Sequence, residues 1–182
     1  MCILTESEIT SMASSGLLIS DGFSGSSVTP NGYDLRIQTL LLPDAAHETS
    51  HDAEIPPHSW FVVSTLEKIT LPGNISAQLW IRSSYARKGL FGSFGKVDAG
   101  FSGTLTLSFF NASSKSIRLA GGERVAQIVF ERLCSNTDRD YASRSGNYQN
   151  QAGITLEPPE RAPVRTSSSG ADGKSLPPES SS

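Results

Sequence analysis

One aspartate stands out as a candidate for acid–base chemistry, because a glycine-punctuated turn follows it at once. Asp98 precedes the run Ala-Gly-Phe-Ser-Gly, and an alternating apolar and polar segment, 104–110, comes next. At the rim of a sheet such a carboxylate either bonds its own backbone as a turn former or orients water as a general base near a phosphate. The local pattern alone favours the turn former, so the surrounding motifs must decide.

The segment from Arg82 to Gly89 is a second candidate and suits an anion such as phosphate. Its sequence, Arg-Ser-Ser-Tyr-Ala-Arg-Lys-Gly, predicts one helical turn that Ser83 caps and Gly89 ends. The first N–H groups of a helical turn are unpaired and lie at its positive end, so they bind anions. Arg87 lies one turn on and reaches the same anion with two hydrogen bonds. The alternative is an ordinary capped turn with surface arginines.

Two further polar features need partners or a ligand. Gln127 interrupts an apolar strand pattern, and a buried glutamine there would be satisfied by a subunit interface or a ligand. The segment 141–153 is polar without being low in complexity. It is either an arm that folds over a ligand or partner, or a solvated connector.

Metal-dependent and nucleophilic chemistry have little support in the sequence. His47, His51 and His58 fall in a proline-containing segment, so helical spacing does not bring them together, and we assign them structural or solvent-exposed roles. The chain has no CxxC pair, no Walker-type phosphate loop and no recognisable Ser-His-Asp or Cys-His constellation. We therefore do not expect the His/Cys zinc centre of zinc-dependent deaminases.

The elements that must position these residues are mostly short strands. Thr5 and Glu8 match a capping box, which predicts a short helix ending near Gly16. Alternating patterns predict strands over 33–37, 60–64, 77–81, 104–110 and 124–130. Residues 43–59, rich in histidine, proline and acids, are expected to form an exposed loop or edge insertion. Many short strands with little helix favour a mainly β sandwich or barrel of jelly-roll character.

Composition and charge narrow the functional class. The 182 residues suffice for one domain and a tail, and residues 157–182, dominated by Pro, Ser and Gly, are expected to be disordered. A formal net charge of −3 argues against general nucleic-acid binding. No apolar run has membrane-spanning length and no signal peptide is recognisable, so a cytoplasmic location is the default expectation. Cys2 and Cys134 are expected to be unpaired in a reducing compartment.

Five motifs in order resemble the dCTP deaminase and dUTPase superfamily. They are Pro-Asn-Gly-Tyr-Asp-Leu-Arg at 30–36, Arg-Ser-Ser-x-Ala-Arg-x-Gly-Leu at 82–90, Asp-Ala-Gly-Phe-x-Gly at 98–103, Gly-Glu-Arg-Val-Ala-Gln at 122–127 and Tyr-Gln-Asn-Gln-x-Gly at 148–153. The resemblance implies one domain, 1–156, with a jelly-roll-like distorted β-barrel and a short N-terminal helix. It also implies a homotrimer with active sites between subunits, and an arm, 141–156, that closes over each site.

The resemblance separates two chemistries at Ser108. In the deaminases of this superfamily a glutamate on the strand after the glycine turn moves protons during water attack on cytosine, and its position corresponds to Ser108. A serine hydroxyl near neutral pH cannot shuttle protons as a carboxyl group does. Asp98 matches the aspartate that orients water in dUTP-hydrolysing members. This combination resembles the archaeal-type dUTPases of the dCTP deaminase-like branch, which implies a dUTP diphosphatase forming dUMP and pyrophosphate.

Other functions stay open at this point. A dCTP deaminase, alone or bifunctional with dUTPase activity, is disfavoured by Ser108. A non-catalytic nucleotide-binding regulator is disfavoured by the retained Asp98. A trimeric barrel unrelated to nucleotides is the remaining alternative.

The resemblance also implies a role for each site residue, with dUTP as the ligand and no nucleic-acid or membrane partner. Mg²⁺ would be carried by the triphosphate, without direct protein ligands, and Asp98 would be catalytic. The phosphate-binding set is Ser83, Ser84, Arg87, Tyr141, Tyr148 and Gln151. The base- and sugar-binding set is Gly95, Lys96, Val97, Phe101 and Gln127.

The sequence departs from the superfamily pattern at two places. A lysine that commonly precedes the tyrosine of the arm is Asn147 here, so one phosphate charge is either missing or supplied elsewhere, for example by Arg144. The stretch between Arg87 and Asp98 is about two residues shorter than in the bacterial deaminases. This second departure leaves the residues of the base pocket open.

Overall fold

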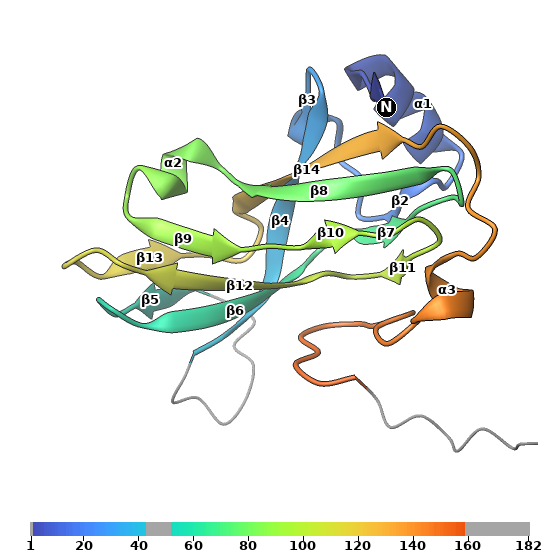
Figure 1. Cartoon of the computed structure of the whole chain (residues 1–182). Coiled ribbons are helices and arrows are strands. Elements are labelled where there is room, and N and C mark those ends of the chain that lie inside the picture. The colour runs from blue at the N-terminus through green and yellow to red at the C-terminus, as the bar shows by residue number, and fades with distance from the viewer. Residues whose placement is uncertain (1, 43–51, 159–182) are drawn as a thin grey trace, which may run out of the picture.

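The computed structural model describes residues 2–42 and 52–158, and most of its elements are β-strands (Figure 1). The strands are β1 Cys2–Ile3, β2 Leu18–Asp21, β3 Val28–Thr29, β4 Gly32–Leu41, β5 Ala53–Ile55, β6 Trp60–Thr65, β7 Lys68–Thr70, β8 Ile75–Ile81, β9 Leu90–Ser93, β10 Lys96–Val97, β11 Ser102–Gly103, β12 Thr106–Asn111, β13 Ile117–Leu119 and β14 Arg124–Arg132. The helices are α1 Glu6–Ser14, the 3₁₀ turn η1 Gly25–Ser27, α2 Ser83–Ala86 and α3 Tyr141–Arg144. The strands predicted from the alternating patterns are confirmed.

The N-terminal helix α1 begins and ends where its sequence signals predict. The backbone N–H of Thr5 donates to Glu8 Oε2 at 2.9 Å, which completes the capping box. After the helix, Gly16 adopts the positive φ of 74° that helix-terminating glycines supply. Ile9 is fully buried and joins the core beneath the helix.

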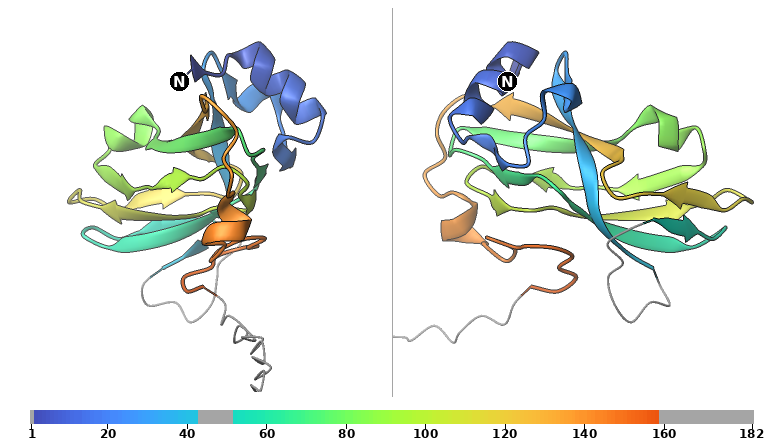
Figure 2. Two further views of the ribbon diagram at one scale, coloured as in Figure 1. Left: turned by 45° about the vertical axis from the view of Figure 1, so that its right-hand side comes forward. Right: turned by 180° about the vertical axis from the view of Figure 1, so that it is seen from behind.

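The main sheet is strongly curled, and its two edge strands lie close together in sequence. Its strands run in the order β10-β8-β14-β4-β6-β12-β9, and all of these pairings are antiparallel. The edge strands β9 and β10 are joined by only Phe94 and Gly95, so the sheet cannot lie flat. The views in Figures 1 and 2 show the resulting half-barrel. The predicted mainly β, jelly-roll-like class is therefore confirmed.

The long strand β4 links the two halves of this curled sheet. Its first part pairs with β14 and its later part with β6, and both ladders carry a register shift near the crossing. Such shifts bend a strand and strengthen its twist. The space enclosed is filled by apolar side chains, including Phe61 and Phe109, whose rings stack with centroids 5.2 Å apart.

One sequence-based prediction of the fold is wrong in part. Residues 53–55, expected in an exposed loop or edge insertion, form β5, which pairs with β13 and buries Ala53 and Ile55. The acids and prolines around them masked a short alternating strand. His47, His51 and residues 159–182 of the predicted tail lie outside the described residues.

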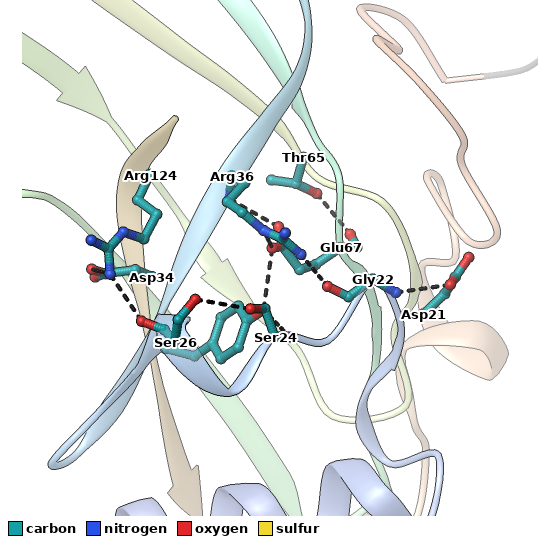
Figure 3. Close-up of polar contacts among 10 residues, drawn as sticks. Asp21, Gly22, Ser24, Ser26, Asp34, Arg36, Thr65, Glu67 and Arg124 are labelled. Carbon is teal, nitrogen blue, oxygen red and sulfur yellow. Dashed lines mark hydrogen bonds and ion pairs between the residues drawn. The ribbon is translucent and has the colours of Figure 1, made fainter. Parts of the chain in front are cut away.

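A buried carboxylate ties β4 to the turn between β6 and β7. The side chain of Glu67 is fully buried and accepts hydrogen bonds from Arg36 Nε at 2.7 Å and from the Arg36 backbone N–H at 2.9 Å. The Tyr33 hydroxyl also donates to Glu67 Oε1. Burial and the Glu67 charge raise the pKa of Tyr33, so the hydroxyl keeps the proton that it donates. Arg36 Nη2 also donates a hydrogen bond to the Gly22 carbonyl (Figure 3). Three segments distant in sequence are thereby joined.

We predict that Arg36→Ala lowers the free energy of unfolding by about 3–5 kcal/mol, because it strands the Glu67 carboxylate in the interior. Chemical denaturation monitored by circular dichroism measures this change. The matched control is Arg132→Ala, which removes the half-exposed ion pair of Arg132 with Glu8 and is expected to shift the transition far less. Equal shifts in the two variants would contradict a stabilising role for the buried network.

Candidate active site

A cavity of about 430 Å³ gathers most of the residues predicted to bind a nucleotide. It is lined by Trp60, Val62, Leu79, Gly95, Lys96, Val97, Asp98, Phe101, Leu105, Thr106, Leu107, Ser108, Tyr141, Tyr148, Gln151, Thr155 and Leu156. Most of these side chains are aliphatic or aromatic, so we call it the apolar cavity. A concave, largely apolar wall with a few polar groups is typical of small-molecule sites.

Asp98 lies at the rim of the apolar cavity, at the start of a tight turn. The Phe101 N–H donates to the Asp98 carbonyl at 3.2 Å, and the Gly100 N–H donates to the Leu71 carbonyl at 3.1 Å. Gly100 has a φ of 85°, which favours glycine, and a Cβ atom at this position would collide with the Asp140 side chain. Within the part of the chain that the structure describes, the Asp98 carboxylate takes part in no hydrogen bond or ion pair, so it is not a turn former that bonds its own backbone.

Ser108 lies on the wall of the same cavity. It sits in β12 opposite Val62 of β6 and Ser93 of β9, with its side chain exposed. Among the residues that line this cavity, Asp98 is the only carboxylate. Ser108, the position that distinguishes the two chemistries, and Asp98, the candidate catalytic acid, thus line the same cavity.

The segment after α3 packs against its own chain as an arm, which excludes the solvated connector. Along its length the Asn150 N–H donates to the Ser102 carbonyl at 2.7 Å and the Thr104 N–H to the Gln151 carbonyl at 3.0 Å. Gly103 makes this approach possible, because a Cβ atom there would lie 2.9 Å from the Gln151 carbonyl oxygen. Tyr148, Gln151, Thr155 and Leu156 of the arm line the apolar cavity, and Figure 2 shows the path of the arm below the sheet.

Two glutamines fasten the arm. Gln151, expected among the phosphate-binding residues, donates from its amide to the Thr104 carbonyl at 2.6 Å. Gln149, which sequence analysis did not select, donates to the Gly100 carbonyl at 3.1 Å and accepts from the Ser102 N–H at 3.2 Å. The polar run at 148–151 was the available signal. Both side chains therefore hold the arm against the turn that carries Asp98.

The two tyrosines of the arm also pack in the cavity wall. Tyr141 meets Phe101 edge to face, with ring centroids 5.6 Å apart. The Tyr148 N–H donates to the Tyr141 hydroxyl at 3.0 Å. This packing fixes the Tyr141 ring in the lining of the cavity that Asp98 also lines.

The residues of α2 are not brought to this cavity within one chain. Ser83, Ser84 and Arg87 are exposed, and α2 lies at the opposite end of the sheet from α3 and the arm (Figures 1 and 2). The helix also begins one residue earlier than predicted: Arg82 is its N-cap, and Ser83 is the first helical residue. Gln127 is likewise outside the cavity lining, and its amide donates to Thr29 Oγ1 at 3.1 Å.

Residues of two other motifs hold α2 in place. Arg82 Nε lies 2.9 Å from the buried Asp34 carboxylate, and Arg82 Nη1 donates to the Arg124 carbonyl at 2.9 Å. The Tyr85 hydroxyl donates to Glu123 Oε2 at 2.6 Å, and burial together with this bond raises the pKa of Tyr85. The motifs at 30–36, 82–90 and 122–127 therefore assemble into one unit that presents α2 to solvent.

The contribution of β6 to the apolar cavity was not predicted from the sequence. Trp60 and Val62 line it, while Phe61 and Val63 point into the core. The period-two pattern of this strand would have placed 60 and 62 on one face, but only the pairing of β6 with β12 brings that face beside Ser108.

Among the described residues there is neither a disulfide nor a group of metal-ligating side chains. Cys2 and Cys134 are both free and exposed, as expected. Across residues 2–42 and 52–158, no three or more His, Cys, Asp or Glu side chains are grouped to hold a metal ion. None of the helices in these ranges has the length and apolar character needed to span a membrane.

Comparison with known proteins adds three findings. A family described as dCTP deaminase-like matches residues 42–133. A protein of Thermococcus kodakarensis named dCTP deaminase is 40% identical over 152 residues, which cover 79% of this chain and 93% of that protein. A protein of Sulfurihydrogenibium named "dCTP deaminase, dUMP-forming" is 32% identical over 173 residues, covering 84% and 94%.

Among solved structures, the 2′-deoxycytidine 5′-triphosphate deaminase from Agrobacterium tumefaciens superposes with a TM-score of 0.63 at 23% identity. The match covers 71% of this chain but 47% of that one, so the present chain spans about half of that protein's length. At this identity the likeness concerns the fold alone, and it agrees with the curled β architecture.

Proposed function

Since the chain belongs to the dCTP deaminase-like family, we propose that it acts on a deoxynucleoside triphosphate and hydrolyses dUTP to dUMP and pyrophosphate. One observation carries the choice of reaction: the apolar cavity presents one carboxylate, Asp98, and has a serine at position 108. A relative whose name includes "dUMP-forming" is consistent with a hydrolytic step on this fold.

In the proposed reaction Asp98 is the general base. Its unpaired carboxylate accepts a proton from a water molecule in line with the α-phosphorus. The water oxygen bonds to that phosphorus while the bond to the oxygen bridging the α- and β-phosphates breaks, so pyrophosphate leaves. Phe101 and the aliphatic wall take the sugar and base, and the arm excludes bulk water.

The donor set fits a magnesium ion that the triphosphate brings with it. The apolar cavity presents one carboxylate, which is too few protein donors to hold Mg²⁺ by themselves, so substrate phosphates and waters would hold the ion. When bound, the ion would neutralise phosphate charge and so favour departure of pyrophosphate.

We further propose that a neighbouring copy completes the site, as a cyclic trimer would. Ser83, Ser84 and Arg87 are exposed and far from Asp98 within one chain, although they suit phosphate binding. A heterologous interface that closes into a ring would place α2 of one copy against the apolar cavity of the next.

An exposed aromatic row gives such an interface a physical driving force. Trp60, Phe110 and Phe91 lie opposite one another on β6, β12 and β9 and are 44%, 42% and 66% exposed. Large apolar patches on a surface mark interaction sites, because covering them releases water. The row continues into the apolar cavity through Trp60.

Deamination of dCTP is the second candidate, because the relative from Thermococcus kodakarensis carries that name at 40% identity. Against it stands the absence, among the residues lining the apolar cavity, of a carboxylate besides Asp98. A binding protein without turnover is a further alternative.

Product analysis tests these alternatives directly. We expect pyrophosphate and dUMP from dUTP with Mg²⁺, and no ammonia from dCTP. Failure to release pyrophosphate at micromolar enzyme concentrations contradicts the proposed hydrolysis. Ammonia released from dCTP would instead support the deaminase.

A further inference from the structure

A second cavity, of about 400 Å³, adjoins the apolar cavity and is lined by more charged side chains. Its lining includes the cations Lys96, Arg139 and Arg144 and the carboxylates Asp98 and Asp140. We call it the basic cavity. Since the cations outnumber the carboxylates, it favours an anion.

The cations of the basic cavity are not neutralised by the protein. None of the three forms an ion pair within residues 2–42 and 52–158, and all three side chains are exposed at the cavity wall. Asp140 is already engaged: its carboxylate accepts the Ser143 N–H at 2.9 Å, which caps α3 and lowers the pKa of Asp140. Guanidinium groups without an ion-pair partner bind phosphate oxygens, often with two hydrogen bonds.

The two cavities meet along three shared residues, Lys96, Asp98 and Tyr141. A nucleoside triphosphate likewise has two parts, a weakly polar base and sugar and a highly charged triphosphate. A ligand whose base occupies the apolar cavity and whose terminal phosphates occupy the basic cavity places its α-phosphorus at the shared boundary. That boundary is where Asp98 lies.

We propose that Arg139 and Arg144, together with Lys96, bind the β- and γ-phosphates in the basic cavity of the same chain that supplies Asp98. This rests on the proposed function and names the phosphate site that function requires. It also accounts for Asn147: the arm, 141–156, has no lysine there, but Arg144 within the arm and Arg139 just before it supply positive charge. Arg87 of a neighbouring copy would approach the same phosphates from the other side.

The test compares the binding of ligands that differ only in phosphates, by isothermal titration calorimetry on the full chain. The probes are a dUTP analogue with a non-hydrolysable imido bridge between the α- and β-phosphates, and dUMP. We expect Arg139→Gln and Arg144→Gln each to weaken binding of the analogue about tenfold, since each removes charge-assisted hydrogen bonds. Binding of dUMP should change less than about twofold, because dUMP does not reach the basic cavity.

The control is Lys68→Gln, which removes one positive charge from an exposed position on β7 that lines neither cavity. It should leave both affinities unchanged. Equal losses for the analogue and dUMP, or no loss for the analogue, would overturn the proposal. Inorganic pyrophosphate that binds together with the analogue, without competing, would also overturn it by showing an independent anion site.

These outcomes are separable from those of the proposed hydrolysis. Arginine-dependent binding of the analogue without pyrophosphate release refutes the hydrolysis and retains the phosphate site. Normal turnover with unchanged affinity in both arginine variants refutes the phosphate site and retains the hydrolysis.

Discussion

Replacing Asp98 by asparagine is expected to reduce dUTP hydrolysis by a factor of about 10²–10⁴ while leaving binding of the nucleotide nearly intact. The amide has the shape of the carboxylate but accepts no proton, and removing a positioned general base costs rates of this order. The Asp98 carboxylate has no partner among the described residues, so its loss breaks no structural contact. Initial rates of pyrophosphate release and calorimetric titration with the imido analogue measure the two effects.

The control is Asp138→Asn, which makes the same change at an exposed aspartate that lines neither cavity. It should retain full activity. An unchanged rate in Asp98→Asn would show that Asp98 does not act on water and would refute the proposed mechanism. Equal losses of rate and affinity would assign Asp98 to nucleotide binding instead.

Mixing two inactive variants is expected to restore about one quarter of the wild-type activity if the site lies between copies. Asp98→Asn keeps a functional α2, and Arg87→Gln keeps a functional Asp98. In a ring of randomly mixed subunits, about a quarter of the interfaces then pair an intact Asp98 with an intact Arg87. The parents are mixed under conditions that allow subunit exchange, and pyrophosphate release is followed.

A second mixture tests the same geometry from the other direction. The double variant Asp98→Asn/Arg87→Gln is mixed in equal amounts with the wild-type chain. Sites shared between neighbours would leave about a quarter of the activity, whereas sites contained within one chain would leave about half. A mixture of the single variants that stays as inactive as its parents would refute the shared site.

Several elements were predictable because their signals are local. The capping box at Thr5 and Glu8 and the positive φ at Gly16 define α1 within a few residues. The strands follow from alternation, which reflects the two faces of an extended chain. The prediction was wrong where pairing with a strand remote in sequence determines the structure. Residues 53–55 form a strand because they pair with β13.

The candidate site was predictable only in pieces. Asp98, Phe101 and the tyrosines of the arm were selected by motif and do line one cavity. Trp60, Gln149 and Arg139 were not selected, because the packing of segments remote in sequence decides which residues line the cavities or fasten the arm. Within one chain, Ser83 and Arg87 do not line the cavity that contains Asp98. That they share a site with Asp98 therefore remains a prediction about neighbouring copies.

The sequence by itself determined the strand pattern, the family and the contrast between Asp98 and Ser108, since residue type and periodicity carry that information along the chain. Only the tertiary structure decided which side chains share a space. The pairing of β12 with β6 sets Ser108 opposite Val62, and the arm closes on the turn after Asp98. These placements depend on strand register and on contacts between segments that are remote in sequence.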